Sequence, residues 1–582
     1  MMNGKGAGAR ALSRALTAAA LVAALAACDG HAPLDANGGR ALPPEGPSQQ
    51  LDPRCAGTSG TTHAGGSITT ATTWPASGSP HRVTGTVTLS TGGTLTVEPG
   101  VVVCFEPQTG LQSYGGRLVA QGTAATPIVL TARDPVHGWY GVSLQGAPVN
   151  TSYLTNARVE YASVYSTAIA SFGHPVLIDS TVVRQSGGGV RLQGRTSRFW
   201  YSRVDTTTNR NIAAVTLGDS ARFVESVIVR AAGIGMLIEG TAGIRVLGGR
   251  IEASGGTGIR APNHTGIIQS APVRVVGGAS YGIETTIALL RKLYDSNDGT
   301  LQDSLKGNAR DTVVMLGGPL VNNSVYVRPG LPWHVKAPIT VEGGGLLLAR
   351  STALMVLDPD VTISTSSNGR INLRGTPAAP VVLTADDPAF GWGGITLNGM
   401  PTVPSYISNA RLEHVGYAHT AVVANAPHPV IVDSAVFRQN GRAVTLLSAG
   451  SQLSRSRVDT TLSSSGPAVE LGADAVLAST LIRGSSGDGV VIHTSTVQVQ
   501  SCEVRGSVGD GIVLDAATPI PNCNLVSNGG VGVRNNTAGV AAVANNWWGD
   551  AAGPFGPNGD GLWGTSNYTP FLTAPYVLPY VP

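Results

Sequence analysis

The sequence predicts an all-β solenoid, in which the chain winds into stacked coils of about 21 to 24 residues. A short strand pattern returns along the chain at that spacing, and a glycine-rich corner follows it. The composition agrees, because 77 glycines and only 13% charged residues suit short strands joined by tight turns. A repeat of this size cannot bury its own apolar face, so stacking of neighbouring coils must supply the core.

The strand pattern is a turn residue, a small residue, a variable residue, an aliphatic residue, and a polar or charged residue. It opens twelve times, at Asn156, Asp179, Tyr201, Glu225, Gly248, Asn409, Asp433, Arg455, Ala478, Ser501, Asn522 and Asn545. The residues on either side of the aliphatic member are expected to point outward, because side chains alternate along a strand. The pattern therefore predicts part of the surface as well as the core.

A longer repeat divides the solenoid into two tandem units. Residues 118–205 match residues 371–459 at an offset of 253 to 254 positions. We expect a first unit at 76–261, a junction at 262–333, a second unit at 334–545 and a C-terminal cap at 546–582. Within the junction, the sequence predicts a helical turn at 287–294 and strands at 313–317 and 325–332.

Residues 1–27 have the features of a secretory signal, with basic residues, an apolar run and then small residues. They end in Leu25-Ala26-Ala27-Cys28, which resembles the lipobox of bacterial lipoproteins. The resemblance implies export and a lipid on Cys28 that anchors the chain in a membrane, at the outer membrane or cell surface. Asp29 resembles an inner-membrane retention signal, and ordinary cleavage beside an incidental cysteine is a further alternative. Residues 28–75, rich in Pro, Gly, Ser and Thr, predict a flexible tether.

The charge of the chain argues against nucleic acid as a partner. Three of the 38 basic residues (Lys5, Arg10 and Arg14) lie in the leader, which leaves 35 basic against 35 acidic residues in the rest. No run of Lys or Arg remains to follow a phosphate backbone.

Four cysteines follow Cys28, and an exported chain permits disulfides. Cys502 and Cys523 hold the same small, inward position in successive coils. Strands of neighbouring coils lie about 4.8 Å apart, within the Cα range that a disulfide tolerates, so we predict this bridge. Cys55 and Cys104 form the only other pair, with no comparable argument to join them. We expect no metal site, because no histidine falls at ligand spacing beside either pair.

The solenoid resembles bacterial right-handed parallel β-helix proteins. The resemblance rests on residues 93–101, on the coil pattern, and on the ending from Asn545-Asn546-Trp547-Trp548-Gly549 to residues 568–572. It covers residues 82–575 and implies a right-handed parallel β-helix. The group contains uncharacterised surface proteins as well as polysaccharide lyases, hydrolases and epimerases, so the fold alone transfers no function.

Alternate coils are predicted to carry an arginine–acid pair on their outward face, and the coils between them apolar residues such as Thr181/Val183, Ala435/Phe437 and Thr480/Ile482. The pairs include Arg158/Glu160, Arg203/Asp205, Arg411/Glu413 and Arg457/Asp459. Acids two coils apart would lie about 10 Å from one another, and the arginine beside each acid favours its ionised form. Such pairs would form exposed ion pairs or a contact strip for a glycan or protein.

Two further recurring features were weighed for chemistry. Trp139 and Trp392 occupy matched loops and are predicted either to stack on sugar rings or to cover the flank of the solenoid. In the first case, replacing both would weaken glycan binding with little loss of stability. His174 and His428 recur with an aspartate nearby, but we identify no nucleophile at a consistent place beside them, and we predict no catalytic residue.

The sequence therefore favours a non-enzymatic scaffold, anchored in the cell envelope, that presents a long face for adhesion or glycan binding. Its expected partners are a membrane, polysaccharide or envelope proteins. The alternative is a polysaccharide lyase or glycoside hydrolase of the β-helix type. We expect no cofactor for the scaffold, and calcium only for the enzyme.

Overall fold

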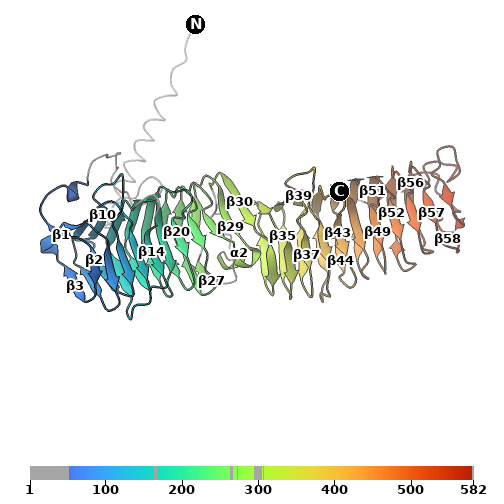
Figure 1. Ribbon diagram of the computed structural model, residues 1–582. Helices are drawn as coiled ribbons and strands as arrows, with labels where there is room; N and C mark the ends of the chain where they lie inside the picture. The colour runs from blue at the N-terminus through green and yellow to red at the C-terminus, as the bar shows by residue number, and fades with distance from the viewer. Residues whose placement is uncertain are drawn as a thin grey trace, which may run out of the picture. The chain divides into compact units, whose positions relative to one another are not determined.

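A computed structural model describes residues 52–579, except 163–166, 263–266, 272, 294–304 and 306. Nearly all regular structure is parallel β-strand, stacked coil upon coil, and the core runs through the centre of the coils (Figure 1). The expected signal peptide, Cys28 and Asp29 lie outside the described residues.

In the first unit each coil contributes one strand to each of three sheets. Sheet I consists of β1 (Thr61–His63), β4 (His81–Val83), β7 (Val102–Phe105), β10 (Ile128–Ala132), β13 (Ala157–Glu160), β16 (Val182–Ser186), β19 (Arg203–Thr207), β22 (Val227–Val229), β25 (Arg250–Glu252) and β28 (Arg274–Val276). Sheet III consists of β3 (Ala71–Trp74), β6 (Thr94–Val97), β9 (Arg117–Gln121), β12 (Ser152–Thr155), β15 (Val176–Asp179), β18 (Arg198–Trp200), β21 (Arg222–Val224), β24 (Ile244–Leu247) and β27 (Ile267–Ala271).

Sheet II runs through both units. Its strands in the first unit are β2 (Gly66–Ile68), β5 (Val87–Ser90), β8 (Leu111–Tyr114), β11 (Val142–Gln145), β14 (Thr167–Phe172), β17 (Gly188–Gln193), β20 (Val215–Leu217), β23 (Met236–Ile238), β26 (Ile259–Ala261) and β29 (Tyr281–Thr285). It continues with β30 (Arg310–Met315), β33 (Trp333–Val335), β36 (Leu354–Leu357), β39 (Val381–Ala385), β42 (Ala410–Glu413), β45 (Val436–Asn440), β48 (Arg457–Thr461), β51 (Thr480–Ser485), β54 (Cys502–Arg505) and β56 (Cys523–Val526).

Two further sheets complete the second unit. Sheet IV consists of β31 (Gly318–Val321), β34 (Ile339–Glu342), β37 (Ile363–Thr365), β40 (Ile395–Leu397), β43 (Thr420–Ala424), β46 (Arg442–Leu446), β49 (Val469–Leu471), β52 (Val490–Ile492), β55 (Ile512–Leu514), β57 (Val533–Asn535) and β59 (Leu562–Trp563). Sheet V consists of β32 (Ser324–Val327), β35 (Leu346–Arg350), β38 (Arg370–Arg374), β41 (Ser405–Ser408), β44 (Val430–Asp433), β47 (Gln452–Ser454), β50 (Val476–Ala478) and β53 (Gln498–Val499). A short pair, β58 (Ala541–Ala542) and β60 (Ser566–Asn567), lies near the C-terminus.

The strand pattern of the sequence forms the first strand of each coil. A residue in the left-handed region turns the chain into that strand, for example Asn156 at φ 46° and Tyr201 at φ 42°. In the second coil of the pattern the turn falls at Ser180 (φ 48°), one residue later than the predicted Asp179. The same one-residue shift occurs at Ser434 and Ser479, so the strands that follow present different residues to the surface than predicted.

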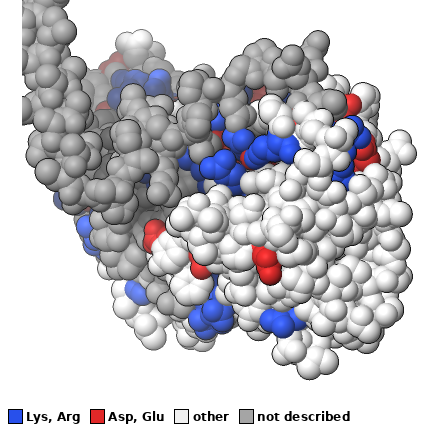
Figure 2. Space-filling view, turned by 90° about the vertical axis from the view of Figure 1, so that its left-hand side faces the viewer, with Lys and Arg blue, Asp and Glu red and all other residues white. Residues whose placement is uncertain are grey.

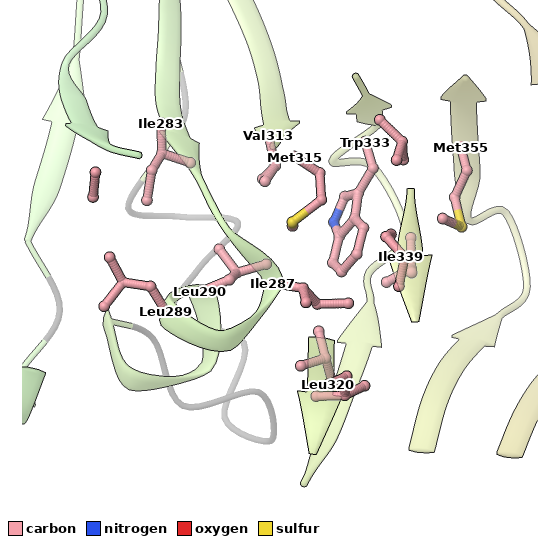
Figure 3. Close-up of a cluster of buried hydrophobic side chains, with 14 of the residues drawn as sticks. Ile283, Ile287, Leu289, Leu290, Val313, Met315, Leu320, Trp333, Ile339 and Met355 are labelled. Carbon is pink, nitrogen blue, oxygen red and sulfur yellow. The ribbon is translucent and has the colours of Figure 1, made fainter. Parts of the chain in front are cut away.

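The junction keeps the coils continuous but changes the phase of the repeat. The predicted helical turn is present as α2 (Ile287–Leu293), which packs against β27, β31 and β32. Its Ile287 and Leu290 point into the same core as Met315 and Trp333 (Figure 3). The chain then returns to sheet II, where β30 pairs with β29.

This phase change places the two copies of the repeat on different sheets. Strand β10 of the first unit lies in sheet I, whereas β39, its sequence equivalent, lies in sheet II. The same holds for β13 and β42, and for β19 and β48. The outward residues of the pattern in the two units therefore lie on two separate sheets.

The N-terminal boundary of the solenoid differs from the prediction. Strands β1, β2 and β3 already form a complete coil that pairs with the next one, so residues 61–75 belong to the solenoid and not to the tether. His63, Trp74 and His81 stack on one another in these first coils. Figure 2 looks onto this end of the solenoid, where most of the described surface is uncharged.

Two disulfides join parts of the solenoid. Cys502 and Cys523 lie opposite each other on β54 and β56 and form the predicted bridge, with their Cα atoms 4.5 Å apart. Cys55 and Cys104 form a second bridge, which ties the 3₁₀ helix η1 (Pro53–Cys55) to β7. A second 3₁₀ helix, η2 (Ala76–Gly78), follows the first coil.

The last coils close with aromatic residues, as predicted, but the three tryptophans differ in burial. Trp548 is fully buried and Trp547 is half-buried. Trp563 is 50% exposed, with the guanidinium of Arg534 over its ring.

Candidate functional site

The outward face of sheet I carries a row of ion pairs. Glu160 is fully buried and contacts Arg184 at 2.9 Å and Arg54 from η1. Burial lowers the pKa of Arg54, but the hydrogen bond to Asp52 and the charge of Glu160 outweigh this effect and raise it. Two coils further along the same sheet, Asp205 contacts Arg203 at 3.0 Å and Arg230 at 2.5 Å.

The equivalent row of the second unit lies on sheet II. Glu413 contacts Arg411 at 2.9 Å and Arg438 at 3.7 Å. Asp459 contacts Arg457 at 2.8 Å and Arg483 at 2.5 Å.

The electrostatic state of Asp459 follows from its burial and from its two arginine partners. Burial raises the pKa of its carboxyl, but hydrogen bonds from Arg457 and Arg483 outweigh burial and bring the pKa below its usual range. An acid held in this way stays ionised, so it cannot donate a proton to a leaving group.

In the coil of β22 the predicted apolar pair is confirmed, because Val227 and Val229 flank the buried Ile228. The other three coils between the pairs are not apolar, which corrects the prediction for them. Because the turn falls one residue later in these coils, the residues that point into the core are Val183, Phe437 and Ile482. Their outward neighbours are Arg184, Arg438 and Arg483, which pair with the acids of adjacent coils. Asp205, Glu413 and Asp459 are therefore each held by the predicted arginine of their own strand and by one from the next coil. Glu160 is held by Arg54 and Arg184, so the predicted pair with Arg158 is wrong.

Trp139 and Trp392 do not lie on the surface. Of the two predicted alternatives, burial against the flank of the solenoid is confirmed, and stacking on sugar rings is wrong for both. Each indole is fully buried, and its Nε1 donates a hydrogen bond to the backbone carbonyl of an acid that belongs to the ion-pair rows. Trp139 donates to Glu160 at 2.8 Å and Trp392 to Glu413 at 2.9 Å. Trp139 also stacks on Phe105, with ring centroids 3.9 Å apart. The two tryptophans fix the strands that carry the ion pairs.

His174 and His428 form no dyad with an aspartate. Each lies in the core, where its Nε2 hydrogen-bonds a serine hydroxyl one coil earlier, Ser152 at 2.7 Å and Ser405 at 2.8 Å. Each serine also accepts a backbone N–H, that of Leu118 in the first unit. This serine recurs in the sequence, contrary to the prediction that none does, but the pair is sealed from solvent and serves the packing.

Burial lowers the pKa of both His174 and His428 below the ordinary value. The unfolded chain therefore binds protons near pH 6.5 that the folded chain does not. The stability contributed by the neutral rings is complete above that pH and is lost as the pH falls toward the folded pKa. We expect the melting temperature to drop by several degrees between about pH 7 and pH 5, and the double variant H174Q/H428Q to show a smaller drop. An unchanged pH dependence in the double variant would contradict this explanation.

Sheet III carries a row of three arginines that the sequence patterns did not lead us to predict. Arg198, Arg222 and Arg245 lie opposite one another on β18, β21 and β24. Among the described residues, no Asp or Glu forms an ion pair with any of them. Burial lowers the pKa of Arg222, and the charges of Arg198 and Arg245 lower it further. The spacing of 24 and 23 residues matches one coil, and this signal could have revealed the row.

An apolar and aromatic row runs beside these arginines. Trp200, Val224 and Leu247 lie opposite one another, two positions further along the same strands. The guanidinium of Arg198 lies 5.9 Å from the Trp200 ring, and Trp200 stacks on Tyr201, which is 59% exposed. Sheet III thus combines three arginines, which pair with no Asp or Glu among the described residues, with an aromatic surface.

The second unit has neutral residues in the same place. The equivalents of the three arginines on sheet V are Gln452, Val476 and Gln498, which also lie opposite one another. A separate open depression of about 510 Å³ lies at the end of the sheet II row, where it is lined by Arg483 and Arg505.

The described part of the chain contains no helix long and apolar enough to cross a membrane. No curated protein matches the sequence significantly. A family model for the right-handed β-helix region matches residues 394–547, the strands from β40 to β58 and the start of the cap. Together with the parallel pairing of successive coils, this match shows that the chain folds as a right-handed parallel β-helix.

Proposed function

We propose that the protein is a cell-envelope scaffold that binds acidic polysaccharides along sheet III. The observation that carries the proposal is the row formed by Arg198, Arg222 and Arg245, three cations without a described acidic partner. Like charges held side by side cost free energy, and a bound anion removes that cost. Guanidinium groups bind carboxylate and sulfate with paired hydrogen bonds.

The geometry of the row favours a polymer with a regularly repeated charge. Neighbouring coils present their arginines at intervals of about 4.8 Å. The exposed face of Tyr201 and the indole of Trp200 lie beside the cations and offer a surface on which sugar rings can stack. A polysaccharide with a carboxylate or sulfate on successive sugars supplies both kinds of contact.

The ion pairs of sheets I and II support a binding role over an enzymatic one. The acids Glu160, Asp205, Glu413 and Asp459 each contact two arginines. A glycosidase needs a carboxyl that is protonated before it acts, whereas hydrogen bonds from Arg457 and Arg483 bring the pKa of Asp459 below its usual range. The proposal extends the sequence-based expectation of a membrane-anchored scaffold and moves its glycan contact to sheet III.

The test exchanges the arginines for the residues of the second unit. The variant R198Q/R222V/R245Q should bind polygalacturonate roughly tenfold more weakly or worse, because each exposed contact is worth about 0.2–1 kcal/mol and tenfold corresponds to about 1.4 kcal/mol. Its melting temperature should stay close to that of the unchanged protein. Salt should weaken binding of the unchanged protein.

The chain also offers a reciprocal control. The variant Q452R/V476R/Q498R builds the same row on sheet V and should raise the number of polymer sites. Equal affinity of the unchanged protein and R198Q/R222V/R245Q would contradict the proposal. Binding of single-stranded DNA as tight as that of polygalacturonate would show a general polyanion surface instead.

A further inference from the structure

A histidine and two aspartates meet on sheet II at the start of the second unit. His334 lies on β33 between Trp333 and Val335, which both point into the core, so its ring points outward. Figure 3 shows Trp333 and Met355 of the next coil on the core side of these strands. Asp358 and Asp386 directly follow β36 and β39, whose last residues lie opposite each other.

The three side chains are arranged as a set of ligands. His334 Nε2 lies 2.5 Å from Asp358 Oδ1 and 3.8 Å from Asp386 Oδ1, and the three donor atoms all lie within 4.8 Å of one another. In the part of the chain that the structure describes, no Lys or Arg pairs with either aspartate. The side chains of His334 and Asp386 are 16% and 54% exposed, so an ion can reach them from solvent.

The first unit holds a different set at the equivalent positions. There, Arg82, Glu106 and Arg133 take the places of the three residues, and Arg133 forms an ion pair with Glu106. The second unit has thus exchanged both arginines, one for histidine and one for aspartate, while it kept the acid between them. The formal charge of the set changes from +1 to −2 with a neutral histidine. Among the described residues, neither carboxylate pairs with a Lys or Arg, and His334 is their shared neighbour.

We propose that His334, Asp358 and Asp386 bind one divalent first-row metal ion of the zinc type. An imidazole nitrogen in the donor set favours zinc, cobalt or nickel over calcium and magnesium. Ligand bonds of about 2.0–2.2 Å in a tetrahedron place donor atoms about 3.3 Å apart. The observed separations lie on either side of this value, so small side-chain rotations complete the site, and water supplies the remaining ligand.

The ion would link three consecutive coils, β33, β36 and β39, immediately after the junction. The repeat changes its phase there, and α2 stands in place of a strand. A metal clamp would add stability to coils whose N-terminal neighbours are irregular. This role is independent of polysaccharide binding on sheet III.

The test titrates the metal-stripped protein with Zn²⁺ by calorimetry and with Co²⁺ by visible absorption. We expect one site per chain, a cobalt spectrum that reports an imidazole ligand, and a higher melting temperature with Zn²⁺. D386R, which introduces the residue of the first unit, and H334Q should each weaken binding at least tenfold. Both variants should keep the melting temperature of the metal-free protein, because Asp386 is exposed and His334 faces outward.

The chain provides a matched control in a second His–Asp pair. His137 lies 2.6 Å from Asp134 on the surface, without a third donor, so H137Q should bind Zn²⁺ as the unchanged protein does. D386N provides a further variant that removes the charge with little change of volume. Equal affinity in D386R, D386N and the unchanged protein, or binding lost in H137Q, would show an adventitious ion only and overturn the proposal.

Discussion

Replacing Trp139 or Trp392 by alanine is expected to lower the free energy of unfolding by about 3–5 kcal/mol, because either change empties a large volume inside the solenoid. Both indoles are fully buried, and each donates a hydrogen bond to a backbone carbonyl, that of Glu160 or that of Glu413. The alanine variants would leave those carbonyls without their donors as well as create a cavity. Urea denaturation followed by far-ultraviolet circular dichroism measures the effect.

Trp563 provides the control for this prediction. Its side chain is 50% exposed in one of the last strands, so W563A should shift the urea midpoint far less than W139A or W392A. Polysaccharide affinity of W139A and W392A should change only as far as their folded fraction changes. A glycan-binding defect at full stability would instead place the indoles in a binding site and contradict their burial.

Removing the carboxyl of Glu160 is expected to cost about 3–5 kcal/mol, since breaking a buried ion pair leaves its partners without compensation. Glu160 is fully buried between Arg54 and Arg184, and the side chain of Arg184 is itself only 13% exposed. The loss would also remove the contact of Arg54 with sheet I, while the Cys55–Cys104 disulfide still ties η1 to β7. Thermal and urea unfolding of E160A measure the effect.

Glu413 is the matched control, because it occupies the equivalent position of the second unit. It is 13% exposed, and its partners Arg411 and Arg438 are 41% and 53% exposed. Water replaces the lost contacts there, so E413A should cost only about 0–1 kcal/mol. Equal costs for E160A and E413A would show that burial does not determine the strength of these pairs.

The repeat pattern of the sequence predicted the fold because its cause is local. A turn residue with positive φ and an inward aliphatic residue recur in most of the coils that carry the pattern, and both act within a few residues. The Cys502–Cys523 bridge followed from the same register. The phase change at the junction could not be predicted, because it depends on α2 and on a segment in which the pattern is broken.

The surface was predicted less well, for physical reasons that particular residues show. One extra residue before the turn at Ser180 exchanges the inward and outward positions, so that Arg184 faces out where Val183 was expected. The arginines of sheet III lie on the last strand of each coil, which the recurring pattern does not cover. Their spacing was visible in the sequence, but their lack of acidic partners is a property of the fold.

The burial of Trp139 and Trp392 depends equally on tertiary structure. A tryptophan in a matched loop can be exposed and stack on a sugar ring, or it can be buried in the core. Which of the two occurs depends on the residues that surround it in the fold. In this protein Phe105 and the carbonyl of Glu160 receive the indole of Trp139.

The central claim is that the protein binds acidic polysaccharides and does not cleave them. The most direct measurement incubates the purified protein for hours with polygalacturonate and with a neutral polysaccharide, with and without calcium. Bound polymer, new reducing ends and unsaturated products are followed in the same samples. We predict salt-sensitive binding to the acidic polymer alone and no new products. Turnover of either polymer, or equal binding to both, would contradict the claim.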